Sequence, residues 1–177
     1  MKQLALLVGE RDRVQGLLNA PVTLVKYGDY ECSRCGQAHS LVKELQKRLG
    51  NRLCFVFRHF PLTLIHAYAQ YAAETSEAAC AQGRFWEIHN YQFEHQQVLS
   101  DTSLLQYAAH LGLDMDRFER EIAEHIYANR VREDFESGVN SGVNGTPTFF
   151  INNIRYEGAC NLESLLTAIE QASQYNS

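Results

Sequence analysis

Two cysteines two residues apart, Cys32 and Cys35 in the stretch YGDYECSRCGQAH, have the types and spacing best suited to chemistry in this sequence. Thiol exchange needs one thiolate that attacks and a second thiol that displaces the partner from the mixed disulfide. One helical turn would bring the sulfurs together, and the N–H groups of a helix start would lower the pKa of Cys32. We expect Cys35, deeper in the helix, to stay protonated until needed. The alternatives are two buried free cysteines or half of a zinc site.

Charged residues near the cysteine pair would change the pKa values of its thiols. Arg34, which follows Ser33 between the cysteines, is predicted to stabilise the reduced form by placing positive charge beside the thiolate. Glu31 opposes that charge or shuttles protons, although we expect it to be simply exposed. Lys26 is predicted to extend to the edge of the sheet and lower the thiol pKa from a distance. The other interpretation of Lys26 is a desolvated amine whose own low pKa lets it take the proton of Cys35.

A second feature with possible chemistry is Thr146-Pro147, at the start of the strand-like run PTFFIN. Proline cannot donate to a strand ladder, and Gly145 gives the chain room to bend, so we predict a cis bond before Pro147. The backbone groups of Thr146 would then be free to pair with an extended substrate beside Cys32. An ordinary trans proline in a turn is the alternative.

Two apolar runs must position the cysteines. VTLVKY at 22–27 and LCFVF at 53–57 predict buried parallel strands. Between them, apolar residues from Ala38 to Leu49 recur on one face of a helix that stops at Gly50. The cysteine pair therefore lies at the carboxyl end of a strand, where the crossover helix starts.

Residues 64–140 have a helical composition, and we predict four short helices broken near Gly83, at 99–103 and at 112–116. The stretch 137–145 is interpreted as a helix end that unwinds into a loop. The tail then predicts a hairpin that turns at Asn152 and Asn153, followed by a last helix capped by Asn161.

Bulk properties exclude several classes of protein. With 177 residues and 45% hydrophobic side chains, the chain can bury one core without disulfide staples or a structural metal. The 21 acidic and 16 basic side chains give a charge of -5, which argues against a nucleic-acid partner. No run approaches the roughly 18 apolar residues of a membrane span, so we expect no membrane insertion.

Cysteine usage and the N-terminus indicate the compartment. The apolar stretch at 4–8 is too short for a signal peptide, and five cysteines, an odd number, fit a reducing environment. We expect a cytoplasmic protein, or a periplasmic one if a leader has been lost. Cys54 and Cys80 are expected to be small buried side chains, whereas Cys160 lies in a loop where it could be exposed and open to modification.

A zinc site would have to pool Cys32 and Cys35 with His39 and His59. No second CxxC and no HxxxH completes such a site, so we expect no metal. His39 is expected on the exposed or cleft-facing side of the crossover helix.

Taken together, the stretches APVTLVKYGDYECSRCGQAH, RHFPL, QGRFWEIHNYQF and GVNGTPTFFINNIRYEG resemble a DsbA-like thiol-disulfide oxidoreductase of the thioredoxin superfamily. The resemblance runs from about residue 12 to 169. It implies an α/β protein, a thioredoxin fold with an inserted all-helical domain. Residues 1–63 and 141–177 would form the thioredoxin-like domain, and 64–140 the helical insertion. It also implies that Cys32 attacks, that Cys35 resolves and that Pro147 is cis beside them.

The implied activity is disulfide exchange with protein, peptide or small thiols, glutathione among them, without a bound cofactor. Two departures leave the direction of electron flow open. Ser33 and Arg34 stand where such proteins often carry Pro and an aromatic residue or His, and Lys26 stands where many keep a buried carboxylate. The alternatives are a glutathione-linked transferase or isomerase of the kappa-like branch, which would not need Cys35, and a non-catalytic module that binds zinc or a peptide.

Overall fold

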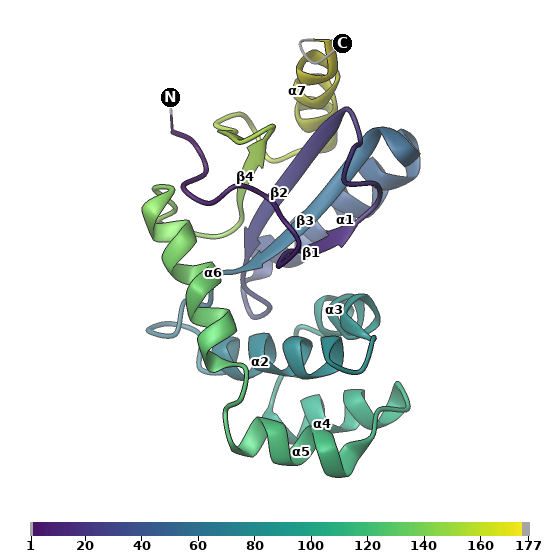
Figure 1. The fold of residues 1–177 in the computed structure, drawn as a ribbon, viewed down its shortest axis with the longest axis vertical. Coiled ribbons are helices and arrows are strands. Elements are labelled where there is room, and N and C mark those ends of the chain that lie inside the picture. Colours follow the sequence, from purple (N-terminus) through teal and green to yellow (C-terminus); the bar gives the residue numbers. More distant parts are fainter. Residues whose placement is uncertain (1, 175–177) are drawn as a thin grey trace.

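The two apolar runs form the centre of the sheet. In the computed structural model, which describes residues 2–174, they are β2 (Val22–Gly28) and β3 (Leu53–His59), paired in parallel along their whole length. The helix α1 (Ser33–Leu49) connects them (Figure 1). The predicted strand–helix–strand unit is therefore confirmed, because β-branched and apolar runs separated by one amphipathic helix fold locally into this crossover.

Three more strands complete a sheet with the order β1-β3-β2-β4-β5. β4 (Thr148–Ile151) pairs antiparallel with β2, and β5 (Ile154–Arg155) pairs antiparallel with β4. The hairpin turns at Asn152 and Asn153, which have φ values of 46° and 71°, as predicted from asparagine's tolerance of this region. β1 (Arg13–Gln15), antiparallel to β3, was not predicted, because three residues carry no periodic signal.

The two faces of the sheet are covered differently. Alternate side chains of a strand point to opposite faces. Val22 and Leu24 join the larger core cluster with residues of α1 and of α7 (Leu162–Gln174), whereas Val25 and Tyr27 join a second cluster that packs against α6 (Ala128–Asn140). Lys26 has the parity of Leu24, and therefore points toward α1.

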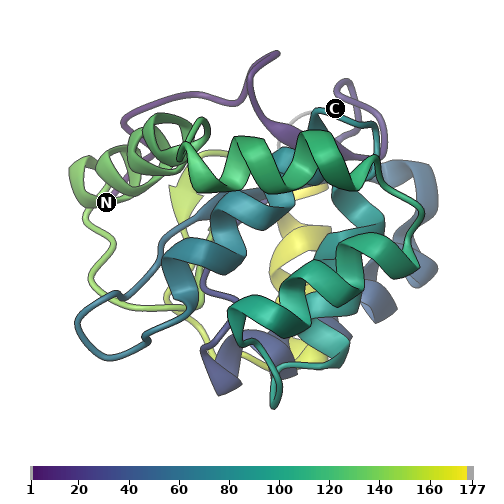
Figure 2. The same ribbon diagram turned by 90° about the horizontal axis from the view of Figure 1, so that it is seen from below.

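Five helices, not four, lie between β3 and β4: α2 (Ala69–Cys80), α3 (Phe85–Glu94), α4 (Asp101–His110), α5 (Met115–Ala123) and α6, seen from below in Figure 2. The three predicted breaks are present. The prediction missed the break between α5 and α6, where His125 has a φ of 52°. No Gly or Pro marks that turn, so the sequence carried no signal for it.

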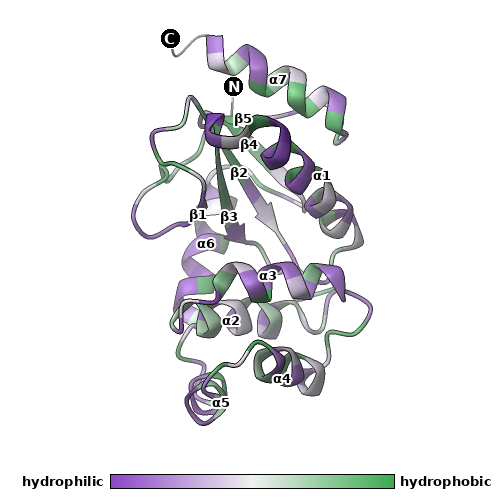
Figure 3. Ribbon diagram, turned by 90° about the vertical axis from the view of Figure 1, so that its right-hand side faces the viewer, coloured by the Kyte–Doolittle hydropathy of each residue, from purple (hydrophilic) through white to green (hydrophobic). Residues whose placement is uncertain are grey.

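The helical block is not isolated from the sheet. One core cluster includes Phe55 and Phe57 of β3 together with Phe85, Ile88 and Phe93 of α3. In Figure 3, purple and green segments alternate along the helices, as expected for helices with one apolar face. The domain boundaries drawn from composition, at 64 and 140, stay a prediction.

The ends of the helices agree with their sequence signals. Asn161 accepts a hydrogen bond from the backbone N–H of Ser164 at 2.9 Å, which confirms it as the cap of α7. α6 ends at Asn140 and the chain continues as a loop to Thr148, as predicted. Among the residues that the structure describes, none of the helices has the length and apolar character needed to cross a membrane.

Candidate active site

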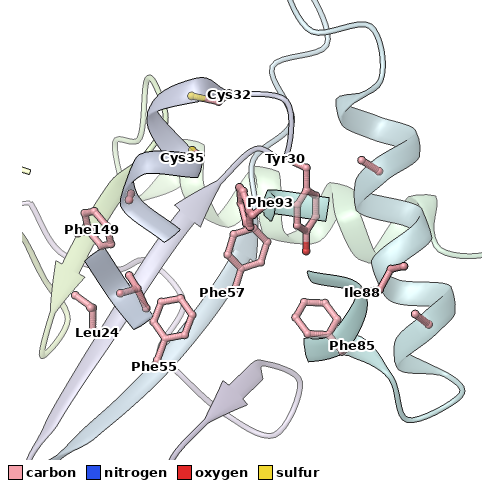
Figure 4. Close-up of a cluster of buried hydrophobic side chains, with 14 of the residues drawn as sticks. Leu24, Tyr30, Cys32, Cys35, Phe55, Phe57, Phe85, Ile88, Phe93 and Phe149 are labelled. Atoms are coloured by element: carbon pink, nitrogen blue, oxygen red, sulfur yellow. The ribbon is translucent and has the colours of Figure 1, made fainter. Parts of the chain in front are cut away.

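The N-terminus of α1 holds the cysteine pair at the carboxyl end of β2. Cys32 is the N-cap residue, with extended backbone angles, and its carbonyl oxygen accepts hydrogen bonds from the N–H groups of Cys35 at 2.9 Å and Gly36 at 3.2 Å. Cys32 is 8% exposed and Cys35 is completely buried. Figure 4 shows Cys32 at the outer end of the helix and Cys35 beneath it, above the aromatic core.

The two thiols have opposite pKa shifts. Hydrogen bonding from the Cys35 thiol, with further contributions from Thr146 and from the N–H groups of Cys35 and Arg34, outweighs burial and lowers the pKa of Cys32 to about 5. Burial raises the pKa of Cys35 well above its ordinary value, and the hydrogen bond to Cys32 adds to the rise. The site therefore contains one thiolate and one protonated thiol near neutral pH, because each group meets a different environment.

The loop before β4 forms the opposite wall. The Thr146–Pro147 peptide bond is cis. The carbonyl oxygen of Thr146 lies 3.5 Å from the Cys32 Sγ, which donates to it only when protonated, and the Thr148 hydroxyl donates to the carbonyl of Gly145 at 2.7 Å. Thr146 and Pro147 are thus brought beside Cys32, although they are more than a hundred residues away in the chain.

Lys26 is fully buried, so the prediction that it extends to the edge of the sheet is wrong. β2 is the central strand, flanked by β3 and β4, and its face toward α1 is covered. The ammonium group donates to the carbonyl oxygen of Cys35 at 3.0 Å and lies 4.4 Å from the centre of the Phe93 ring. Burial lowers the pKa of Lys26 to about 8. This is the environment of the other interpretation, a desolvated amine close to Cys35.

The other residues predicted to act on the cysteine pair make few side-chain contacts with it. Ser33 and Arg34 are exposed on the first turn of α1. Arg34 contributes to the low pKa of Cys32 through its backbone N–H. Glu31 is half-buried, not simply exposed as expected, and its carboxylate accepts a hydrogen bond from the backbone N–H of Tyr68 at 2.8 Å. Glu31 therefore fixes the segment that leads into α2.

Sequence analysis missed Asp29, which organises the approach to Cys32. One carboxylate oxygen of Asp29 accepts from the N–H of Glu31, and the other accepts from Leu62 N–H and from the His66 ring, all at 2.8 Å. Partial burial lowers the pKa of His66, but the bond to Asp29 outweighs it and the pKa is raised. These residues are far apart in the chain and form no sequence motif.

Gln96, just beyond α3, is a second residue that was missed. Its side-chain amide donates to the carbonyl oxygens of Tyr30 at 2.7 Å and Cys32 at 2.9 Å. A Cβ atom at Gly36 would lie 1.9 Å from the Gln96 side-chain oxygen, so only glycine leaves room for this contact. The glycine inside the first turn of a helix was the available signal for a close approach.

The structure does not assemble the zinc candidate. His39 is buried and stacks on Phe93 at 5.0 Å, so the prediction that it is exposed is wrong, although it lines a small pocket beside His89. His59 is buried with its Nε2 2.8 Å from Glu77. Within residues 2–174, no group of three or more His, Cys, Asp and Glu side chains gathers in a way that could hold a metal.

The other cysteines lie as follows. Cys54 is buried in the second core cluster, as predicted, whereas Cys80 is only half-buried against the larger one. Cys160 is exposed in the loop before α7 and lies close enough to Lys26 to interact with it electrostatically.

Comparison with known proteins agrees with this geometry. A family model described as Thioredoxin matches residues 9–171. BdbD from Bacillus subtilis superimposes with a TM-score of 0.85 at 22% identity, covering 93% of this chain and 94% of BdbD. Wolbachia pipientis alpha-DsbA1 superimposes with a TM-score of 0.85 at 23% identity, covering 99% of this chain and 98% of its own. The DsbA-like fold indicated by the sequence is confirmed.

Curated relatives with higher identity carry a different name. A protein of Salinispora arenicola named Na(+)/H(+) antiporter NhaA 1 is 48% identical over 163 residues, which are 92% of this chain and 25% of that protein. A protein of the same name from Mycobacterium sp. is 40% identical over 163 residues, 91% of this chain and 27% of its own length. The chain therefore spans about a quarter of the length of these relatives.

Proposed function

The chain belongs to the thioredoxin family, and from this premise we propose that it is an enzyme that exchanges disulfides through Cys32 and Cys35. Cys32 attacks the partner and Cys35 resolves the mixed disulfide. Thr146 and Pro147 border the place where the partner binds. No bound cofactor is part of the proposal. The names of the curated relatives describe ion transport by much longer proteins, and the proposal concerns thiol exchange alone.

One observation carries this proposal: the two neighbouring thiols differ in ionisation. Cys32, with a pKa lowered to about 5, is a thiolate at neutral pH and therefore nucleophilic. Cys35 is buried, protonated and hydrogen-bonded to Cys32. This arrangement supports a two-thiol mechanism over glutathione-linked transfer, for which a second thiol would be unnecessary.

The surface beside the pair supports protein or peptide partners. Leu64 and Ile65 are 99% and 72% exposed in the loop between β3 and α2. Asp29 ties that loop to the segment before Cys32. We propose that apolar residues of a substrate contact this loop, while the backbone of Thr146 and the exposed Ser33 and Arg34 meet the chain around the substrate cysteine. Glutathione would need only the thiolate, and remains part of the proposed substrate range.

A trapping experiment tests the reaction. Cys35→Ser is expected to accumulate a mixed disulfide on Cys32 when mixed with an oxidised model peptide, because nothing resolves the adduct. Cys32→Ser is expected to form none, and Cys80→Ala, which removes a thiol outside the motif, is expected to behave like wild type. Mass spectrometry of the intact proteins measures the adduct. Stoichiometric zinc in the reduced protein together with no adduct in any variant would favour the binding-module alternative.

Direction and compartment follow from the reduction potential of the pair. We propose the cytoplasm, supported by the odd number of cysteines. Equilibration in graded glutathione buffers measures the potential. A value below about -220 mV would indicate a reductase, and a value near -120 mV an oxidant of thiols, which would contradict the proposed compartment.

A further inference from the structure

Lys26 is a buried cation to which no carboxylate of the described residues is paired. Its ammonium group is completely buried in the centre of the sheet. Among residues 2–174 its polar contact is the carbonyl oxygen of Cys35, and the Phe57 and Phe93 rings lie 5.8 and 4.4 Å away. A buried ammonium group with so few partners is costly. Stability therefore does not explain why a lysine is placed against the resolving cysteine, and a role in the reaction would.

The titratable groups around Lys26 are thiols and imidazoles. Cys32, Cys35 and His39 face it from α1, His89 faces it from α3, and Cys160 faces it from the loop before α7. Burial and the charge of Lys26 lower the pKa of both histidines, that of His39 to about 4. These histidines are neutral near pH 7, so the thiols are the groups that can exchange charge with the amine.

We propose that Lys26 is the proton acceptor and donor for the Cys35 thiol during the resolving step. This role rests on the function proposed above. It identifies the base for the second chemical step, in which Cys35 resolves the mixed disulfide. The contact between Lys26 and the backbone of Cys35 holds the amine next to the residue that must ionise. No described Asp or Glu side chain forms an ion pair or hydrogen bond with Lys26, so the amine is free for this exchange.

In the mixed disulfide, the Cys35 proton moves from Sγ to the neutral amine of Lys26, which becomes an ammonium. The Cys35 thiolate attacks the Cys32 sulfur, the bond between Cys32 and Cys35 forms, and the bond from Cys32 to the partner breaks. The partner leaves as a thiolate with the electron pair and takes a proton from solvent. The protein pair is oxidised and the partner is reduced. In reverse, the Lys26 ammonium protonates Cys35 as it leaves.

Burial lowers the pKa of Lys26 into the range that proton exchange with Cys35 requires. A group that both accepts and donates a proton works best when its pKa lies near the working pH. The pKa of Lys26, lowered to about 8, leaves both forms populated near neutrality. An ordinary exposed lysine would be almost fully protonated.

The test separates the two chemical steps. Reduced protein is mixed with an aromatic disulfide, quenched with acid, and the fragment that carries both cysteines is weighed by mass spectrometry. The adduct on Cys32 appears in a first phase and disappears in a second, when Cys35 resolves it. Lys26→Met is expected to slow the second phase by about 100-fold, a typical contribution of a proton-transfer group, while the first phase changes by less than about threefold.

Two variants separate proton transfer from charge. Lys26→Arg keeps the positive charge but does not release a proton at these pH values, so it is expected to be slow as well. Lys47→Met, an exposed lysine on α1, is the matched control and is expected to resemble wild type. A fast second phase in Lys26→Arg or in Lys26→Met would overturn the proposal.

Wild type alone provides an independent readout if the variants fail to fold. Its second phase is expected to accelerate with pH and to level off with an inflection near pH 8. The absence of an inflection between about pH 7 and 9 would refute the role of Lys26. If no adduct forms on Cys32 at any pH, the proposed function itself fails, which distinguishes the two failures.

Discussion

Charged side chains are buried in two regions of the molecule, and they are paired in one region and unpaired in the other. The active-site cluster consists of Lys26, Cys32 and Cys35, and its cation has no carboxylate partner within the part of the chain that the structure describes. The second region, called here the charge network, lies between the sheet and the helical block. It pairs each of its three buried carboxylates with arginine or histidine, and consists of Asp12 with Arg58, Glu77 with Arg13 and His59, and Asp134 with Arg11 and Arg130.

The two regions show what decides the ionisation of a buried group. In the charge network, hydrogen bonds to His59 and Arg13 outweigh burial, and the pKa of Glu77 falls to about 2. In the active-site cluster, burial outweighs all other interactions of Lys26, and its pKa falls toward neutrality. Paired charges stay fixed and stabilise a fold, whereas an unpaired charge becomes able to gain and lose a proton.

The largest expected effect comes from breaking the charge network. Asp12 and Arg58 form a fully buried ion pair with N–O distances of 2.7 and 3.0 Å. Arg58→Met is expected to lower the free energy of unfolding by about 3–5 kcal/mol, because Asp12 is left buried and unpaired. Urea denaturation measures the change. The double variant Arg58→Met/Asp12→Leu is expected to recover much of it, and a loss below about 1 kcal/mol in the single variant would contradict this account.

The next effect is a pH dependence carried by Glu77. Its pKa falls from an ordinary 4.5 to about 2 in the folded protein. A carboxyl group with a depressed folded pKa adds stability above its unfolded pKa, and that stability is lost as the pH falls from 4.5 toward 2. The loss amounts to about 3 kcal/mol. Urea denaturation measures the free energy of unfolding at each pH in this range. That free energy is expected to fall less steeply with decreasing pH in Glu77→Gln than in wild type, and equal slopes would argue against the pairing.

Lys26→Met is expected to change the free energy of unfolding in the opposite direction to Arg58→Met, because it removes a buried charge that has no partner. A lysine whose folded pKa is lowered destabilises the fold below that pKa, and the penalty disappears as the pH rises from about 8 to 10.5. The disulfide form of the variant is therefore expected to gain about 1–3 kcal/mol of unfolding free energy at neutral pH, and less above pH 8. Denaturation of oxidised wild type and variant checks this. A loss like that of Arg58→Met would mean that Lys26 is a structural charge.

The smallest effect is expected at Arg34. The pKa of Cys32 is lowered by hydrogen bonds from Cys35, Thr146 and backbone N–H groups, and the exposed guanidinium of Arg34 is screened by solvent. Arg34→Ala is expected to shift the Cys32 pKa by less than about 0.5 unit, measured as the pH midpoint of iodoacetamide alkylation. Cys35→Ala, which removes the hydrogen bond that lowers the Cys32 pKa most, is the comparison and is expected to raise that pKa further. A larger shift in Arg34→Ala would restore the role predicted from the sequence.

Much of the fold could be predicted because its signals are local. The run 22–27, the helix after Cys32 and the turn at Asn152 and Asn153 each depend on backbone preferences and apolar spacing within a few residues. The start of α1 likewise needs only local sequence to place two cysteines one turn apart. Where a local signal was missing, as at His125 between α5 and α6, the prediction failed.

The electrostatics of the site could not be predicted in the same way. The sequence favoured a Lys26 that extends to the edge of the sheet, and only the packing of α1 and α3 over the central strand shows that it is enclosed. Gln96 reaches the cysteine loop across a separation of 66 residues, and Asp29 reaches His66 across 37. No spacing rule connects such partners.

The sequence by itself determined the two thiols, the helix start that holds them and the strands that lead to it, because these depend on chain-local geometry. The sequence also indicated which thiol ionises, whereas the tertiary structure alone decided which lysine loses its solvent and which carboxylates are paired. The physical reason is that a pKa depends on the solvent and charges within a few ångströms of a group, and those neighbours come from distant parts of the chain.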